Sequence, residues 1–446
     1  MSTLTTPRAV PGGADFPKRG LADSLRARRL MVIVVGLYSL ASPIVETLLG
    51  DRQHYVEGKT STVAVAAALD DLGAVVVPAI AIAATFVVLL FWRVEGPPLL
   101  LAIAPGLMLA ANEFVHGRSP TLGLLITSAV GALMVSVRVK MPDLAILGHV
   151  GAVVAGASIL AFVVVPSKVL VSGGIGTFDK SLTGAPLLAG IFSHSNTFGM
   201  FLALSLPCAF LARRLLVRLL LVAVICAALV LSSSRTALAG AGAVLAVMLL
   251  ARLLPRAAFL PVAVVGFLTS VFAVFWLPFT ETDPDAYTYR GAIWIFDRGQ
   301  LGGHGMFGLG AHWFADNYPL LRNVLSSAAS HAHNLALTTM VQGGAVVALT
   351  GGVLIVAAFV SALRHPSARE RAVGIAFVIG LLVIGATETP MELVGWSPLS
   401  ASVLVPLVVV AGRPWIEREE EAFARSAAAD APVAPLTRAA LRRRAR

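Results

Sequence analysis

Two histidines stand close together in the segment Ser330–Asn334, which reads SHAHN and directly precedes a long apolar run. His331 and His333 belong to a chain that has only nine histidines. An imidazole suits proton transfer near neutral pH, and it is also a common metal ligand. Residues two apart do not share one face of a regular helix, so we expect one ring to point into a site and the other away from it.

Two arginines have surroundings that suit an anion. Arg235 lies in LSSSRTALAG between two apolar runs, and Arg290 lies in the aromatic segment YTYRGAIWIF. A guanidinium group at a membrane edge must reach water or a partner, and its planar donors match a phosphate. The alternative for Arg235 is simple snorkelling. The alternative for Arg290 is a solvated position or a cation–π pair with Tyr287 or Trp294.

A third polar stretch is GIFSHSNTFGMF, in which His194 precedes Asn196 by two residues. His194 either orients a lipid headgroup or caps a helix, and the residues alone leave both open. Three carboxylates also fall at ends of apolar runs on the expected outer side, where they could pair with the arginines: Glu113, Glu388 and Glu392.

A metal site is the competing interpretation of the histidines. His304 and His312 precede the SHAHN segment within one predicted loop. A zinc site needs four ligands, usually at short and regular spacings. These spacings do not match, so we predict no metal and no cofactor.

The elements that carry these residues are membrane helices. The chain has 446 residues, of which 57% are hydrophobic and 13% are charged, against about 25% charged in a typical soluble domain. Apolar runs of near-spanning length recur from Leu30 to Ala411, which predicts an all-α polytopic membrane protein. The net charge of +10 comes largely from arginines in the terminal arms and turns, so nucleic acid is not the expected partner. Both cysteines lie inside apolar runs, which argues against a disulfide framework.

We predict about twelve transmembrane helices. The bias of lysine and arginine toward alternate short loops places both termini in the cytoplasm. The predicted spans are 30–49, 72–92, 98–113, 121–137, 144–165, 190–211, 215–232, 237–251, 258–279, 336–361, 373–387 and 399–412.

The spans divide the chain into five parts. Residues 1–29 form a basic cytoplasmic arm without a recognisable cleavable signal, and residues 30–279 hold the first nine spans. Residues 280–334 form one large extracytoplasmic loop. Residues 335–412 hold the last three spans, and residues 413–446 form a mobile cytoplasmic tail near anionic lipids.

The large loop is rich in aromatic residues, which predicts that it is folded. Ala286–Arg298 and Ala311–Leu325 are predicted to be short helices on the membrane surface. Gly299–Gly310 lies between them and reads GQLGGHGMFGLG. A phosphate-binding loop would follow a strand and precede Lys-Ser/Thr, so a flexible turn is the favoured interpretation.

Four segments resemble the O-antigen ligase and polymerase superfamily of bacterial envelope glycosyltransferases. They are GIFSHSNTFGMFLAL, LSSSRTALAGA, YRGAIWIFDRGQLGGHGMFGLGAHWF and HAHNLALTTMVQGG, in the family's order, over roughly Gly190 to Gly344. The resemblance implies a glycosyltransferase C-like helical fold in the cell membrane. It also implies transfer of a glycan from a polyprenyl-diphosphate carrier to an acceptor hydroxyl on the outer face, without metal. The acceptor is a glycan, a lipid or a protein, and ligase and polymerase activities stay equally open.

The resemblance also implies roles for individual residues. Arg235 and Arg290 correspond to the diphosphate-binding arginines, and His333, directly before the asparagine, corresponds to the base. His331 is the alternative base. The predicted catalytic residues are His333, Arg235 and Arg290, and the predicted substrate contacts are Arg235, Arg290, His194, His331 and Asn334.

Two points limit the resemblance. Many family members have an acidic residue shortly after the histidine, where this chain has Gln342, so a carboxylate that assists the base is not expected there. A transporter or flippase of envelope glycolipids is the alternative function, because many spans and an arginine within the membrane also fit that class. Such proteins often have paired broken helices, and the sequence shows no such pair.

Overall fold

The computed structural model describes residues 25–50, 64–91, 96–171, 181–182, 184, 186–325 and 330–429. Within these ranges the chain is helical apart from short loops and an isolated bridge between Leu170 and Leu188. The longer helices are α1 (Leu25–Leu49), α2 (Ala64–Phe91), α3 (Gly96–Val115), α4 (Leu122–Ser136), α5 (Ala145–Val164), α7 (Ser195–Ala209), α8 (Leu215–Ser232), α9 (Arg235–Leu253), α10 (Arg256–Thr280), α11 (Ala286–Gln300), α12 (Trp313–Leu325), α13 (Leu335–Leu363), α14 (Ala368–Gly385) and α15 (Ser400–Ala429). Two short 3-10 helices, η2 (Met141–Leu144) and η3 (Pro166–Lys168), flank α5.

The protein is a helical membrane protein. In the described ranges, seven helices are long and apolar enough to cross a bilayer: α1, α3, α5 with η2, α8, α9, α10 and α13. Shorter apolar segments lie in α2, α4 and α15. Each of the twelve predicted spans coincides with a helix, while a crossing by the remaining helices stays a prediction.

Two predicted boundaries are wrong. The span expected from residue 190 begins only at Ser195, because Gly190 has a positive φ and the following residues form a turn. The tail expected to be mobile from residue 413 is helical through Ala429, as the continuation of α15. The basic arm up to residue 24 and the tail from residue 430 lie outside the described residues.

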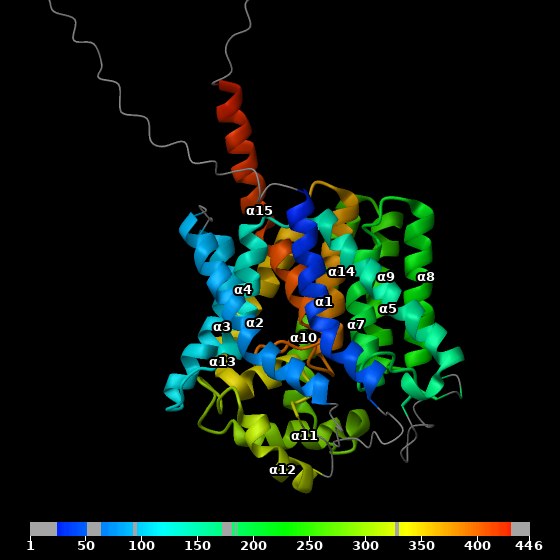
Figure 1. Ribbon diagram of the computed structural model, residues 1–446, viewed down its shortest axis with the longest axis vertical. Coiled ribbons are helices and arrows are strands. Elements are labelled where there is room, and N and C mark those ends of the chain that lie inside the picture. The colour runs from blue at the N-terminus through cyan, green and yellow to red at the C-terminus, as the bar shows by residue number, and fades with distance from the viewer. Residues whose placement is uncertain are drawn as a thin grey trace, which may run out of the picture.

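The two short helices of the large loop are present as predicted, as α11 and α12. They pack together at one end of the bundle, and α15 projects from the opposite end (Figure 1). Trp294 of α11 is fully buried, and its indole N–H donates to the carbonyl of Ala332 at 2.8 Å. Arg298 donates to the carbonyls of Pro278 and Glu281 at the end of α10. These bonds fix α11 to both the bundle and the SHAHN segment.

The glycine-rich segment is not the flexible turn that the sequence suggested. It docks against a break in α13, where Gly344 has φ +65° and ψ −167°. The N–H of Leu309 donates to the carbonyl of Val341 at 2.7 Å, and the N–H of Ala345 donates to the carbonyl of Gly305 at 2.9 Å. A Cβ on Gly344 would lie 2.2 Å from the carbonyl oxygen of Met306. Glycine is therefore required at this break because both the backbone angle and the contact exclude a side chain.

Close helix packing brings the polar segments together. On α7, a Cβ at Gly199 would lie 2.8 Å from the Cβ of Ala237 on α9. On α9, a Cβ at Gly240 would lie 2.5 Å from Cγ1 of Ile384 on α14. Small residues let membrane helices approach closely and pack tightly. As a result, the N-terminal ends of α7 and α9 lie beside the C-terminal end of α14.

Candidate functional site

The centre of the site is the segment Thr387–Thr389, which directly follows α14 and which we call the central segment. The hydroxyl of Thr387 lies 2.8 Å from that of Thr236 on α9. The hydroxyl of Thr389 lies 2.8 Å from that of Thr338 on α13. The two threonines therefore tie the segment to two helices and hold Glu388 between them.

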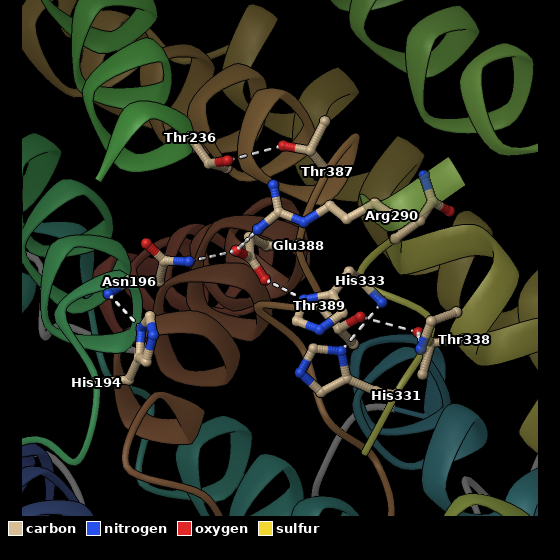
Figure 2. A network of polar contacts seen from close by, with 12 residues as sticks. His194, Asn196, Thr236, Arg290, His331, His333, Thr338, Thr387, Glu388 and Thr389 are labelled. Carbon is tan, nitrogen blue, oxygen red and sulfur yellow. Dashed lines mark hydrogen bonds and ion pairs between the residues drawn. The ribbon is translucent and has the colours of Figure 1, made fainter. Parts of the chain in front are cut away.

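The carboxylate of Glu388 joins three other parts of the chain (Figure 2). Its Oε1 accepts hydrogen bonds from the guanidinium group of Arg290 on α11 and from Nδ2 of Asn196 on α7, the latter at 3.0 Å. Its Oε2 lies 2.9 Å from Nδ1 of His333. The Glu388 side chain is only 2% exposed, whereas those of Arg290 and His333 are 17% and 22% exposed. The carboxylate is thus an internal link, and the cation and the imidazole reach the surface of the site.

The charge of this carboxylate follows from its partners. Burial alone would raise the pKa of Glu388, but the hydrogen bond from His333 and the positive charge of Arg290 lower it to about 2. Glu388 is therefore ionised at neutral pH, and it accepts hydrogen bonds without donating any.

The contact with Glu388 determines which nitrogen of His333 can react. A carboxylate accepts hydrogen bonds, so Nδ1 of His333 carries the proton and Nε2 is the acceptor in the neutral ring. The backbone of His333 has φ +48°, in the left-handed region. The ring is thereby held by its backbone and by one hydrogen bond, with the basic nitrogen directed elsewhere. This arrangement is that of an oriented general base.

The two histidines do not point in opposite directions, so that expectation is wrong. The rings of His331 and His333 contact each other edge to face, with centroids 4.2 Å apart. The reason is that SHAHN is an irregular loop and not a helix, so helical spacing does not apply. Nδ1 of His331 accepts the backbone N–H of His333 at 3.1 Å. Burial and the neighbouring His333 lower the pKa of His331 to about 3, so this ring stays neutral.

His194 and Asn334 both cap helices. His194 precedes α7, and its Nδ1 accepts the backbone N–H of Asn196 at 3.0 Å, which confirms the capping alternative. Asn334 is fully buried, and its Oδ1 accepts the N–H of Leu337 in the first turn of α13. Its Nδ2 donates to the carbonyls of Val274 and Ala386. The amide of Asn334 is thus used inside the protein, where it positions the SHAHN loop, and its contact with substrate stays a prediction.

Arg235 is the first residue of α9, and its side chain is exposed. The next residue, Thr236, bonds to the central segment through Thr387. The structure thus places the start of α9 directly against the segment that carries Glu388. Arg290 enters from α11 after three consecutive residues with left-handed backbone angles, Tyr287–Tyr289. Such strained conformations concentrate at functional sites.

Three helices begin at this site: α7, α9 and α13. The N-terminal end of a helix carries a partial positive charge and unpaired N–H groups, which favour a bound anion. These helix ends, Arg290 and Arg235 all carry positive charge or partial charge, and Glu388 is the negative group between them. The arrangement suits a negatively charged group that approaches from the exposed side of Arg290.

A metal ion is the other ligand that this geometry could hold. Ligand atoms of His331, His333 and Glu388 lie within 4.8 Å of one another, and two imidazoles with one carboxylate form a known zinc-binding set. His304, one of the earlier loop histidines considered as a ligand, is exposed and contacts the carbonyl of Gly302, so it does not join this set. Any metal bound here would compete with Arg290 and Asn196 for the same carboxylate.

Local sequence features did not reveal which carboxylate holds His333. Gln342 made a carboxylate partner unexpected, yet Glu388 provides one from a segment more than fifty residues further on. Glu388 had been named only as one of several possible partners of the arginines. Glu113, another of those, instead accepts the N–H of Ala311 at 2.7 Å. The threonines around Glu388 were not foreseen, although a Thr-Glu-Thr stretch at the end of an apolar run is a visible polar signal.

Comparisons of the chain with protein-family models, with curated proteins and with solved structures gave no match.

Proposed function

We propose that the protein is a membrane glycosyltransferase that moves a glycan from a polyprenyl-diphosphate carrier to an acceptor hydroxyl at the outer face of the membrane. The observation that carries this proposal is the cluster of Arg290, Glu388 and His333 beside the start of α9. It combines an anion-binding guanidinium group with an oriented base at one end of a membrane helix bundle. Ligase and polymerase activities remain equally compatible with it.

The reaction follows from these roles. Nε2 of His333 takes the proton of the acceptor hydroxyl, and the oxygen attacks the anomeric carbon of the donor sugar. The bond between that carbon and the phosphate oxygen breaks, and its electron pair goes to the diphosphate. Arg290 and Arg235 stabilise the charge that develops there. Glu388 holds the imidazole in one tautomer and stabilises the imidazolium that forms. The products are the glycosylated acceptor and the polyprenyl diphosphate.

The roles of the cations and the imidazole do not require a metal. In this proposal the three ligand atoms at His331, His333 and Glu388 serve proton transfer and orientation. The chelator arm of the experiment below decides between this chemistry and metal-assisted transfer.

The test is a transfer assay with the full chain in nanodiscs, native lipid-linked glycans as donor and an extract of envelope glycolipids as acceptor. We expect His333→Ala and Arg290→Ala to abolish transfer. The chain offers matched controls, because His304 and the ion pair between Arg118 and Asp316 are exposed. His304→Ala and Arg118→Ala should transfer at the rate of the parent protein. Full transfer by His333→Ala would refute the proposal, and loss of transfer on addition of EDTA would indicate a metal enzyme.

One observation favours the alternative of a transporter or flippase. Helix α13 is interrupted at Gly344, and discontinuous helices are frequent at the substrate sites of transporters. In this chain the break is filled by the glycine-rich segment, which gives it a structural role. Flipping of a fluorescent lipid-linked sugar across proteoliposomes, without glycan transfer, would support the alternative function.

A further inference from the structure

A large cavity lies next to the site and shares the start of α7 with it, since Thr197 belongs to its wall. Its volume is about 910 Å³, within the usual range for ligand pockets. The walls come from α1, α2, the start of α4, the turn before α7 and the segment after Met391. Ala41, Leu72 and Ser193 belong to the wall and are exposed, so the cavity is open to the exterior.

The cavity and the candidate site share two segments. Ser193 and Thr197 line the cavity, and between them lie His194 and Asn196 of the site. Trp396 lines the cavity as well, and it follows the central segment by only a few residues. A molecule bound in the cavity would therefore reach toward Glu388 and its partners.

Most of the lining is apolar, and it includes two aromatic rings and several hydroxyl groups. Tyr38 and Trp396 stack with centroids 5.9 Å apart. Their polar ends are used within the protein, since the Tyr38 hydroxyl donates to the carbonyl of Gly73 and the Trp396 indole donates to the hydroxyl of Ser39. Both rings are thereby held in place, and each is partly exposed. Ser42, Thr121 and Glu46 add groups that can hydrogen-bond hydroxyls.

This combination suits a sugar ring. A pyranose has an apolar C–H face, which packs on an aromatic ring, and a rim of hydroxyls, which needs hydrogen-bonding groups. A prenyl chain would offer no hydrogen bond to the hydroxyls of Ser42 and Thr121 in the wall. A diphosphate would need cations, and none of the described residues that line the cavity is a lysine or an arginine. The only charged residue among them is Glu46.

We propose that this cavity is the subsite for the acceptor glycan, an inference that rests on the proposed function. The donor diphosphate occupies the arginine side of Glu388, and the cavity, which lacks cations in its described lining, receives the neutral sugar that carries the attacking hydroxyl. The aromatic pair Tyr38–Trp396 holds its C–H face. The open side between α1 and α2 admits the rest of the acceptor from the membrane.

The first test measures binding without any transfer. The full chain in nanodiscs is examined by saturation-transfer NMR with methyl β-D-glucopyranoside, methyl α-D-mannopyranoside and methyl α-L-rhamnopyranoside as probes. We expect at least one glycoside to bind the parent protein. Ala41→Phe fills the cavity and should remove that signal. Ala227→Phe is the matched control, because Ala227 is an exposed alanine on α8, outside the cavity wall, and should leave the signal unchanged. Absence of binding in the parent, or equal binding in both variants, would overturn the proposal.

The second test uses the transfer assay. Trp396→Leu removes an aromatic contact and Ala41→Phe fills the cavity, so each should raise the KM for acceptor by about 10-fold, with the KM for donor unchanged. A rise confined to the donor KM would instead assign the cavity to the donor glycan and refute the proposal. Trp396→Leu serves as the second variant if Ala41→Phe does not give monodisperse protein. Binding of glycosides without any transfer by the parent would reject the proposed function while supporting the subsite.

Discussion

Among the described residues, two histidine–glutamate pairs lie one at each end of α14, and they use the imidazole differently. At the C-terminal end, His333 contacts Glu388 through Nδ1, so Nε2 is available. At the N-terminal end, His365 contacts Glu370 through Nε2 at 3.0 Å, while its Nδ1 accepts the N–H of Ser367 at 3.1 Å. Both nitrogens of His365 are therefore occupied within the protein. The same two residue types leave an imidazole nitrogen available at one end and form a structural cap at the other.

The surroundings of the two pairs also differ. Near His365 the polar contacts stabilise helix ends: Arg371 donates to the carbonyl of His365, and Ser367 caps α14. Asp143, close to this end of the bundle, is paired with Arg28 and Arg29. Around His333, by contrast, contacts from three separate parts of the chain converge on one carboxylate, that of Glu388. This convergence beside a partly exposed imidazole, and not the presence of a His–Glu pair, distinguishes the candidate site.

The largest expected effect comes from removing the two imidazoles in turn. His333→Ala should lower kcat by roughly 10²- to 10⁴-fold, the usual contribution of a general base. His365→Ala should leave kcat within a factor of about two, because neither of its nitrogens faces a substrate, and should lower thermal stability instead. Both are measured in the nanodisc transfer assay together with the thermal midpoint of unfolding. Equal kcat values for the two variants would remove the distinction between the pairs.

A smaller effect is expected from the two glutamates. Glu388→Gln should reduce kcat by about 10- to 100-fold, because the amide no longer fixes the tautomer of His333 or stabilises its imidazolium form. Glu388 itself contributes no limb to the pH–rate profile above pH 4, because its pKa is about 2. Glu370→Gln is the control and should change neither kcat nor the profile; a shifted profile there would contradict the comparison.

Local sequence features were sufficient to predict the helices and the ends of the site. Apolar runs gave a segment for each of the twelve longer helices outside the loop, and aromatic content predicted α11 and α12. Arg290, His333 and His194 were also recognised, because charged and ionisable residues are conspicuous beside apolar runs. What connects these residues could not be predicted. Glu388 pairs with His333 and Asn196 only because α7, α9 and α14 approach through small residues, and helix packing is not encoded in local spacing.

The glycine-rich segment shows the same limit in another form. Its composition fits a flexible turn, but Leu309 and Gly305 form backbone hydrogen bonds with α13 at the Gly344 break. Glycine permits both a mobile turn and a close backbone contact, and only the three-dimensional partner decides between them. The misjudged direction of His331 has a related cause, since the positive φ of His333 is invisible in the sequence.

The smallest expected effect concerns a carboxyl that lacks the partners of Glu388. Asp297 of α11 is fully buried, and neither of its oxygens has a hydrogen-bond partner among the described residues, so burial raises its pKa to about 8. Between the usual pKa of an aspartate and pH 8, the folded protein therefore holds a proton that the unfolded chain releases. Stability must fall as pH rises through this range. Glu388 contributes no opposing slope above pH 5, because its pKa is shifted downward. His331, whose pKa is about 3, adds an opposing rise that ends near the ordinary histidine pKa of about 6.5, so the range from pH 7 to pH 8 isolates the effect of Asp297.

Asp297→Asn should remove this dependence, since an amide does not titrate. We expect the thermal midpoint of the parent protein to drop by about one to two degrees between pH 7 and pH 8, and that of Asp297→Asn to stay nearly constant, with kcat unchanged. Asp316→Asn is the matched control, because Asp316 is exposed and paired with Arg118; it should retain the slope of the parent. An unchanged slope in Asp297→Asn would show that this carboxyl is ionised in the folded protein. The contrast between Asp297, which lacks partners, and Glu388, whose partners lower its pKa, would then fail.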